Sequence, residues 1–318
     1  MPLISVIIPA YNAEKTIQET IESVINQSFS DWELIVVNDG SQDRTVEVVD
    51  QIKDPRIKVF SYPNTGVSAS RNRGFDKSVG EFISFLDADD LWTPDKLESQ
   101  LNALCSHPEV AVAYSWTDYI DESGHFLFPG QHATLNGKIY SQILVKFFLE
   151  NGSNMLVRRE AFLKVGGFKE ALFMGEDWEC CISLAKEYEF VAVPRPQILY
   201  RQSTGTASDN VYKYEQECLK VIESIFSDAP ASLQHLKKHS LAHNYKYLAC
   251  KTINSQPTPK KGLAVMKFIL LYALNDPYLK SNFKLMFTIF VKSLGFIFLP
   301  PAIYQNLLGS VKSIKLKD

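Results

Sequence analysis

The chain has 318 residues, of which 46% are hydrophobic and 22% are charged, with 15 glycines and 15 prolines. This composition excludes intrinsic disorder, collagen and low-complexity sequence, and the length predicts about two domains or one large α/β domain with an appendage. The net charge of −3 gives no basic field that would attract nucleic acid, so we expect no nucleic-acid partner.

The charge is spread unevenly along the chain. Residues 260–318 contain nine lysines and two aspartates, a net charge of +7, which leaves −10 for residues 1–259. The five cysteines are odd in number and form no C-x-x-C pair, which argues against a disulfide framework or a thiolate zinc site and favours a reducing cytoplasm. The first apolar run ends at Pro9 and is too short for a signal peptide or an anchor. We expect a cytoplasmic protein, with the inner face of the plasma membrane as an alternative location.

Two β-branched runs and a helical pattern open the chain. Residues 3–8 and 33–37 are predicted strands, and Ile17, Ile21 and Val24 recur between them at helical spacing. Strand, helix and strand form the βαβ unit of a parallel sheet. The alternation continues with a helix, a strand, a helix and a strand over residues 46–52, 57–60, 67–78 and 82–86. These patterns predict a doubly wound α/β domain.

Each predicted strand ends in a polar segment, and open α/β sheets bind ligands beyond the carboxyl ends of their strands. The polar segments are residues 9–12, 38–41, 62–66 and 87–90. We expect them to form one polar cleft. The alternative is that Asp39-Gly40 and Asn64 only make turns, and that Asp87 or Asp90 only caps the next helix.

The cleft suits a nucleotide, but the common phosphate-binding motifs are missing. No G-x-G-x-x-G follows the first strand and no G-x-x-x-x-G-K-[ST] occurs in the chain, which disfavours a hydride-transferring Rossmann enzyme and a P-loop NTPase. A diphosphate must then be neutralised in another way. Asp87 and Asp89 supply hard oxygen ligands for a divalent metal, which implies Mg²⁺ or Mn²⁺ as a cofactor.

The polar segments and their flanking residues resemble, in order and spacing, the family 2 glycosyltransferases of the GT-A fold. The resemblance rests on residues 5–12, 36–43, 64–74 and 85–90 and extends to about residue 205. It implies a doubly wound mixed sheet in a GT-A domain over residues 1–210, with a nucleotide-sugar half at 1–115 and an acceptor half at 116–210. A helical C-terminal region would occupy residues 211–318.

The resemblance also implies roles for individual residues. Tyr11 would stack on the nucleotide base and Asp39 would accept a hydrogen bond from a uracil ring N–H, which favours a UDP-sugar donor. Arg71 would line the nucleotide pocket and hold the loop at Asp87, although a surface ion pair on its own helix is the alternative. The implied nucleotide-sugar residues are Pro9, Tyr11, Asp39, Asn64, Arg71, Asn72, Asp87, Ala88, Asp89 and Glu176, with Asp89 and Asp87 as metal ligands.

The acceptor half should carry a general base. Residues 175–178, Gly-Glu-Asp-Trp, resemble the family's Glu-Asp motif at the start of a helix, which implies that Asp177 is the base. The alternative is an acid in the first turn of a helix, where the macrodipole favours negative charge. Residues 151–159 and 166–168 match the family's acceptor-side strand and turn, and variable loops such as 116–137 are expected to select the acceptor.

One departure from the family pattern bears on how many sugars are added. The Q-x-x-R-W motif of processive cellulose and hyaluronan synthases is absent, and residues 197–202 read QILYRQ. No long transmembrane channel segments accompany it, so we expect a single addition. Arg201 is expected either to help bind the diphosphate or to be a surface arginine.

The C-terminal third shows helical patterns with a break at residues 257–259. Residues 283–308 are strongly apolar but are interrupted by Gly295 and Pro300, so a clean membrane-spanning helix is not expected. Aromatic residues and lysines within 260–318 suit helices that lie in the interface of an anionic membrane. A packed helical subdomain or a dimer interface is an equally good interpretation.

Together these patterns predict an inverting glycosyltransferase that moves one sugar from a UDP-sugar to the hydroxyl of a saccharide or lipid-linked acceptor, in the synthesis of a cell-surface glycan. A sugar-nucleotide pyrophosphorylase is disfavoured because its Gly-rich loop with Arg and Lys is absent after the first strand. A non-catalytic module that binds nucleotide-sugar or lipid would tolerate loss of Asp89 or Asp177, and both are present.

Overall fold

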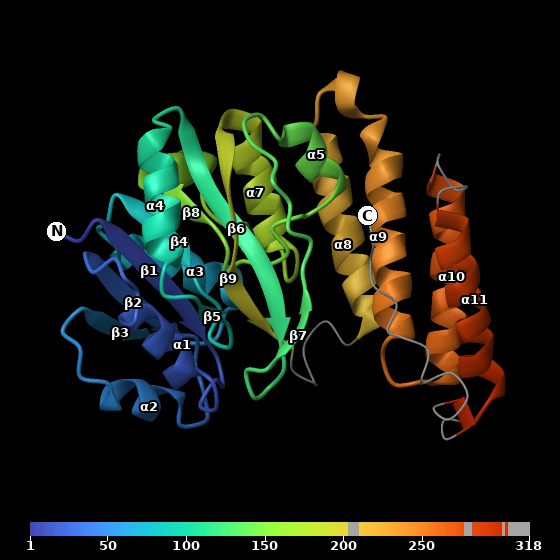
Figure 1. Ribbon diagram of the computed structural model, residues 1–318, viewed down its shortest axis with the longest axis horizontal. Helices are drawn as coiled ribbons and strands as arrows, with labels where there is room; N and C mark the ends of the chain where they lie inside the picture. The colour runs from blue at the N-terminus through green and yellow to red at the C-terminus, as the bar shows by residue number, and fades with distance from the viewer. Residues whose placement is uncertain (203–209, 277–281, 301–302, 305–318) are drawn as a thin grey trace. The chain divides into compact units, whose positions relative to one another are not determined.

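The computed structural model describes residues 1–202, 210–276, 282–300 and 303–304. The chain divides into two compact units, which are Met1–Ile143 with Phe147–Thr206, and Leu144–Lys146 with Ala207–Asp318. We call the first the sheet unit and the second the helical unit (Figure 1).

The described residues of the sheet unit form one nine-stranded sheet in the order β3-β2-β1-β4-β8-β6-β9-β5, and β7 pairs with β6. The strands are β1 (Ile4–Ala10), β2 (Trp32–Asn38), β3 (Ile57–Ser61), β4 (Phe82–Phe85), β5 (Leu91–Trp92), β6 (Val110–Ile120), β7 (Phe126–Pro129), β8 (Leu156–Arg158) and β9 (Glu189–Arg201). The expected doubly wound mixed sheet is confirmed.

Strand direction decides which loops meet. β1 to β4, β6 and β9 run in one direction, whereas β5, β7 and β8 run in the other. The carboxyl ends of β1, β2, β4, β6 and β9 and the amino end of β8 therefore lie at the same edge, which we call the carboxyl edge. The helices that accompany the sheet are α1 (Ile17–Ile25), α2 (Thr45–Gln51), α3 (Val67–Lys77), α4 (Lys96–Ser106), α5 (Tyr140–Val145), α6 (Arg159–Val165) and α7 (Glu176–Glu187).

β1 continues through Pro9, an expected nucleotide-site residue that was predicted to end the strand. Pro9 is buried within β1, in register with Val37 of β2. β4 pairs with β1 only as far as Ile7, whose carbonyl accepts the last hydrogen bond on that side, from Leu86. Backbone groups two residues apart point to the same side of a strand, so an N–H at position 9 would point to the same side as the backbone groups of Ile7, toward β4. Since β4 has already ended there, the N–H that proline lacks would have had no strand to bond to. A proline therefore costs this central strand no ladder hydrogen bond.

Both faces of the sheet are covered by apolar side chains. Ile4, Val6 and Ile8 of β1 belong to one buried cluster that includes Ile21 of α1 and Leu97 of α4. Burying such a side chain contributes about 1.5–3 kcal/mol relative to leaving it exposed. This packing fixes the strand ends at the carboxyl edge.

The opposite face carries an aromatic cluster. The ring of Phe85 in β4 lies 5.2 Å from Phe162 and 4.9 Å from Phe168, measured between centroids. Helix α3 packs closely here, because a Cβ on Gly74 would collide with the side chain of Ile7. A glycine at this position therefore allows α3 to lie against β1.

The described helices of the helical unit are α8 (Val211–Ser227), the 3₁₀ turn η2 (Ala231–Leu233), α9 (Leu236–Ile253), α10 (Pro259–Asn275) and α11 (Phe283–Phe298). Leu248, Phe268, Ile289 and Phe296 belong to its buried core. The break at 257–259 is the start of α10, where Thr258 accepts a hydrogen bond from the Lys261 N–H. Within the described ranges, no helix combines the length and the apolarity needed to cross a membrane.

Candidate active site at the carboxyl edge of the sheet

The loops after β1 and β2 are joined to each other. The backbone N–H of Asn12 donates to Ser41 Oγ at 3.0 Å, and Asn12 Oδ1 accepts a hydrogen bond from the Gln42 N–H at 2.9 Å. The neighbouring Tyr11 is 51% exposed, and Asn64 is exposed as well. Tyr11 is thus held on an ordered loop with an accessible ring, which can stack on a nucleotide base.

Asp39 is buried and organises the loop after β3. Its Oδ1 accepts a hydrogen bond from the Thr65 N–H at 3.0 Å and its Oδ2 accepts one from the Gly66 N–H at 2.8 Å. Arg73 Nη1 lies 3.8 Å from Oδ1. Each carboxylate oxygen has two lone pairs, so Asp39 can accept a further N–H, such as that of a uracil ring.

Arg71 is buried between two carboxylates, with 2% of its side chain exposed. Nη2 lies 2.5 Å from Asp87 Oδ1, and Nη1 lies 2.7 Å from Glu176 Oε1. Gly152 permits this placement, because a Cβ there would lie 2.6 Å from Nη2. Burial alone would lower the pKa of Arg71, but Asp87, Glu176 and Asp177 raise it above its usual value. The alternative of a surface ion pair is wrong, since one buried, charged guanidinium joins the 87–90 loop after β4 to the start of α7.

The loop over residues 87–90 follows β4 and is anchored by hydroxyl groups. The carbonyl of Ala88 accepts hydrogen bonds from Thr16 Oγ1 at 2.8 Å and from Thr20 Oγ1 at 3.0 Å. The N–H of Asp87 donates to Ser153 Oγ at 3.0 Å. Sequence reasoning missed these three hydroxyl groups, although it recognised the segment that contains Ser153.

Asp90 is fully buried inside this loop. Its Oδ2 accepts a hydrogen bond from Ser153 Oγ at 2.6 Å, and its Oδ1 accepts one from the Arg201 N–H at 3.0 Å. Burial and the charges of Asp89 and Asp87 raise the pKa of Asp90 well above its usual value. The next helix begins at Lys96, so the alternative that Asp90 caps a helix is wrong.

Asp87 and Asp89 offer carboxylate oxygens for a divalent cation. Burial, followed by the negative charge of Asp87, raises the pKa of Asp89 to about 6. Among the described residues, no group of three or more His, Cys, Asp or Glu side chains could hold a metal ion on its own. Mg²⁺ commonly binds through one or two carboxylates together with substrate phosphates and water. The donor set therefore fits a cation that binds together with a diphosphate.

Glu176 and Asp177 open α7, after Gly175 in the left-handed conformation at φ 77°. Asp177 Oδ1 accepts a hydrogen bond from the Trp178 N–H at 2.7 Å. Burial and the charge of Glu176 raise the pKa of Asp177 to about 7, against the opposing effect of Arg71. A carboxylate with this pKa can accept a proton near neutral pH. Asp177 does lie in the first turn of a helix, as its alternative interpretation requires.

Asn72 is engaged with the turn at residues 166–170. Its Nδ2 donates to the Phe168 carbonyl at 2.9 Å, and its Oδ1 accepts a hydrogen bond from the Phe168 N–H at 3.0 Å. Nδ2 also donates to Glu170 Oε1 at 3.1 Å. These contacts hold the acceptor-side turn, and a role for Asn72 in the nucleotide pocket stays a prediction.

Arg201 is buried at the end of β9, with 2% of its side chain exposed. The alternative that it is a surface arginine is therefore wrong. Its Nε donates to the Asp89 carbonyl at 2.9 Å, next to Asp90. Arg201 thus joins the 87–90 loop from a strand more than a hundred residues later in the sequence.

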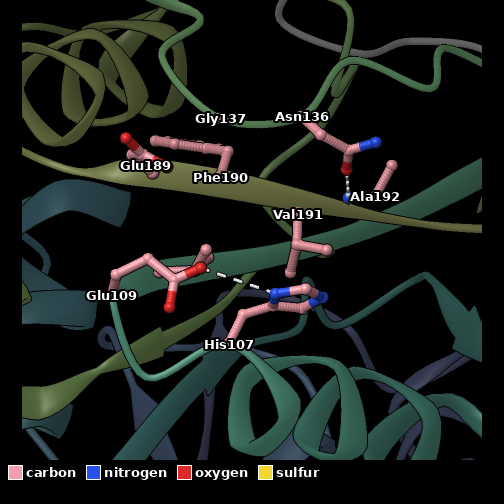
Figure 2. Close-up of a pocket in the computed structure, with 9 residues that line it drawn as sticks. His107, Glu109, Asn136, Gly137, Glu189, Phe190, Val191 and Ala192 are labelled. Carbon is pink, nitrogen blue, oxygen red and sulfur yellow. Dashed lines mark hydrogen bonds and ion pairs between the residues drawn. The ribbon is translucent and has the colours of Figure 1, made fainter.

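A pocket of about 300 Å³ lies at the opposite edge, at the amino ends of β6 and β9 (Figure 2). On its rim, His107 Nδ1 lies 3.5 Å from Glu109 Oε1, and Asn136 Oδ1 accepts a hydrogen bond from the Ala192 N–H at 2.7 Å. None of the residues predicted for catalysis, nucleotide-sugar binding or metal binding lines this pocket, although Asn136 and Gly137 belong to the 116–137 segment that was expected to select the acceptor. It is therefore separate from the candidate active site.

The chain matches the family model described as glycosyltransferase like family 2 over residues 5–252. It is 41% identical over 121 residues to TuaG of Bacillus subtilis (strain 168), named for teichuronic acid biosynthesis, which covers 37% of this chain and 47% of that protein. The chain spans 42% and 47% of the length of two of the curated glycosyltransferases that it matches.

Two solved structures share the fold at low sequence identity. The S. aureus TarS 1-349 structure in complex with UDP-GlcNAc is 18% identical with a TM-score of 0.66, covering 93% of this chain and 89% of that one. The mannosyltransferase PcManGT from Pyrobaculum calidifontis, in complex with GDP-Man and Mn²⁺, is 17% identical with a TM-score of 0.60, covering 97% and 88%. The sheet unit therefore has the GT-A fold.

Proposed function

The chain belongs to the glycosyltransferase like family 2, and from this membership we propose that it transfers one sugar, of the hexosyl type, from a UDP-sugar to an acceptor hydroxyl with inversion at the anomeric carbon. In this proposal residues 1–115 bind the nucleotide-sugar and residues 116–210 bind the acceptor. The product would be part of a cell-surface glycan, a proposal supported by the relative named for teichuronic acid biosynthesis.

The observation that carries the proposal is the bridge made by Arg71. Its guanidinium holds Asp87 at 2.5 Å and Glu176 at 2.7 Å, and Asp177 is the next residue. Asp87, which is predicted to lie near the diphosphate, and the residue before the predicted base thus contact the same guanidinium group. A transferase needs this proximity, because the attacking oxygen and the leaving diphosphate oxygen bind the same carbon.

The proposed reaction is a single displacement. Asp177 takes the proton of the acceptor hydroxyl while that oxygen forms a bond to the anomeric carbon. The bond from that carbon to the diphosphate oxygen breaks, and its electron pair leaves with UDP, which inverts the anomeric centre. Tyr11 and Asp39 would hold the uracil base during this step.

Asp87 and Asp89 would hold a divalent cation, and Mn²⁺ or Mg²⁺ bound there would supply charge neutralisation for the diphosphate. This proposal is supported by the anchoring of the 87–90 loop, whose Ala88 carbonyl accepts hydrogen bonds from two hydroxyl groups. Manganese is also present in the PcManGT structure.

The choice of UDP is testable against the other nucleotides that GT-A proteins bind, since TarS was solved with UDP-GlcNAc and PcManGT with GDP-Man. Titration calorimetry with UDP-, GDP- and dTDP-sugars, each with Mn²⁺ and with EDTA, should show binding of a UDP-sugar that Mn²⁺ strengthens at least tenfold. Preference for a GDP-sugar would overturn the uridine assignment, and no binding of any of them would overturn the donor site.

We further propose that the helical unit contacts an anionic membrane, at the cytoplasmic face of the plasma membrane, where a lipid-linked acceptor would be available. Exposed apolar side chains, 43–76% exposed, recur at helical spacing as Leu263, Leu270 and Leu274 on α10 and Phe283, Phe287, Val291 and Phe298 on α11. Exposed lysines, Lys260 and Lys284, accompany them, and residues 260–318 carry +7. Apolar side chains beside lysines are typical of helices that bind an anionic lipid surface.

A further inference from the structure

The Arg201 side chain is shared among three parts of the sheet unit. Nε donates to the Asp89 carbonyl at 2.9 Å, Nη1 donates to the Glu122 carbonyl at 2.8 Å, and Nη2 donates to Glu19 Oε2 at 2.7 Å. The Arg201 backbone N–H adds a bond to Asp90 Oδ1 at 3.0 Å. Each guanidinium nitrogen therefore already donates to a protein oxygen, which disfavours the predicted contact with a diphosphate.

The hydrogen-bond partners of Arg201 belong to two segments that the proposed reaction must hold in a fixed relative position. Asp89 lies in the loop at the end of β4, and Glu122 lies in the turn between β6 and β7. That turn belongs to residues 116–210, the proposed acceptor half, whereas Asp89 belongs to the nucleotide-sugar half. Arg201 thus ties a loop of one half to a loop of the other.

The chemistry of the guanidinium group suits this role. Arginine presents N–H donors in one rigid plane and stays charged, whereas lysine offers a single rotating ammonium group. Arg201 is 4% exposed, its charge is offset by the carboxylate of Glu19, and each guanidinium nitrogen is hydrogen-bonded, so the group has little freedom to move. The peptide between Asp89 and Asp90 is held on both sides, because Nε binds its carbonyl and the Arg201 N–H binds the following carboxylate.

We propose that Arg201 is a positioning residue that fixes the Asp89 carboxylate for the cation and diphosphate and ties it to the 121–125 turn. The inference rests on the proposed function, because it assigns the purpose of the fixed loop to cation-dependent donor binding. Arg201, which lies outside the motifs that carry the family resemblance, would thus control the geometry of the 87–90 loop.

The first test measures UDP affinity with Mn²⁺ and with EDTA in the full chain. Arg201→Gln should weaken the Mn²⁺-dependent binding several-fold, by no more than Asp89→Asn does, and leave binding in EDTA within twofold. Arg201→Lys should recover part of the loss. The matched control is Arg195→Gln on the same strand, which removes a surface ion pair to Asp95 at 3.2 Å and should change neither value.

A double variant separates positioning from general destabilisation. If Arg201 acts through Asp89, then Arg201→Gln combined with Asp89→Asn should bind UDP with Mn²⁺ no more weakly than Asp89→Asn alone. If the losses of affinity caused by the two single substitutions multiply in the double variant, the two residues act independently and the proposal is overturned.

The second test needs no nucleotide, so it separates this proposal from the proposed function. In the ligand-free protein, Arg201→Gln should speed hydrogen exchange at least tenfold at the amides of residues 87–92 and 121–126, and Arg195→Gln should not. Unchanged exchange at either segment would overturn the proposal, even in an active UDP-sugar transferase. If the wild-type protein shows no Mn²⁺-dependent UDP binding, the donor assignment fails and exchange alone decides the role of Arg201. If Arg201→Gln does not fold, Arg201→Lys carries both tests.

Discussion

The carboxyl edge of the sheet unit gathers buried charged side chains, whereas α10 and α11 of the helical unit carry exposed apolar side chains at helical spacing. Arg71, Asp90 and Arg201 each lie at 0–4% exposure at the carboxyl edge, while Phe287 and Phe298 of α11 are 56% and 76% exposed. Ordinary folding favours neither arrangement, because charged groups are costly to bury and large apolar groups gain by burial. A single exposed leucine such as Leu163 is ordinary, so the recurrence of exposed apolar side chains on α10 and α11, and the clustering of buried charges at the carboxyl edge, carry the comparison. In the proposals above, the first feature serves the chemistry and the second serves membrane attachment.

The largest expected effect is at the proposed base. Asp177→Asn removes the proton acceptor and keeps nearly the same volume, so transfer should fall by at least about a hundredfold. Affinity for the UDP-sugar should stay within twofold in calorimetry. Glu187→Gln at the far end of α7, which loses only a surface ion pair to Lys164, should keep full activity. Equal losses of binding and rate would make Asp177 a structural residue.

The pH dependence follows from the pKa of about 7 that burial and Glu176 give to Asp177. The base acts in its deprotonated form, so the rate should rise about tenfold per pH unit below pH 7 and level off above it. Initial rates between pH 5 and 9 at saturating donor measure this profile. A rate that is flat across pH 6 to 8 would exclude Asp177 as the titrating base.

Removal of the metal ligand should affect donor binding, by a smaller factor than the loss of rate expected at Asp177. Asp89→Asn should weaken UDP binding in Mn²⁺ about tenfold and should leave binding in EDTA unchanged, because the cation links Asp89 to the diphosphate. Asp76→Asn on the exposed face of α3 is the control. UDP affinity and transfer that survive EDTA undiminished would contradict the metal assignment.

Binding of the protein to anionic membranes should be weakened by substitutions in the helical unit and not by substitutions in the sheet unit. Leu270→Ser with Phe287→Ser should lower binding to anionic liposomes several-fold in flotation and leave transfer to a soluble acceptor unchanged. Leu163→Ser, at an equally exposed leucine of α6, is the matched control. Truncation before α10 is a poor test, because Phe268 and Ile289 belong to the core of the helical unit. A wild-type protein that does not bind liposomes would remove the attachment proposal.

The smallest effect is on stability. Folding raises the pKa of Asp177, so its ionised form destabilises the protein, and stability is lost as pH rises from about 4 through about 7. Asp177→Asn should therefore raise the melting temperature by roughly a few degrees at pH 8 and by nothing at pH 4. A lower melting temperature at pH 8 would show that the carboxylate stabilises the native fold.

Local patterns in the sequence were enough to predict the sheet and the loops that meet at the carboxyl edge. β-branched runs and helical spacing are short-range signals, and they located β1 to β4 with ends displaced by only a residue or two. β1 continues through Pro9, where the sequence pattern predicted its end, because the neighbouring strand β4 pairs with β1 only as far as Ile7. No local sequence pattern indicates where a neighbouring strand ends.

The side-chain partners could not be predicted in the same way. Ser153 reaches the 87–90 loop because β8 runs antiparallel between β4 and β6, and Arg201 reaches it because β9 runs parallel to β6. These hydrogen bonds join residues that are 66 and 112 positions apart in the sequence. The burial of Arg71 likewise depends on a distant segment, which includes Gly152. Residue types at the strand ends were therefore predictable, but their hydrogen-bond partners were not.

The most direct test of the central claim is a crystal structure of the protein with UDP and Mn²⁺. We expect the uracil ring to lie against Tyr11, the diphosphate and the cation to lie at Asp87 and Asp89, and the Arg71 bridge to Glu176 to stay intact. Nucleotide bound away from the carboxyl edge, for example in the pocket at the amino ends of β6 and β9, would contradict it.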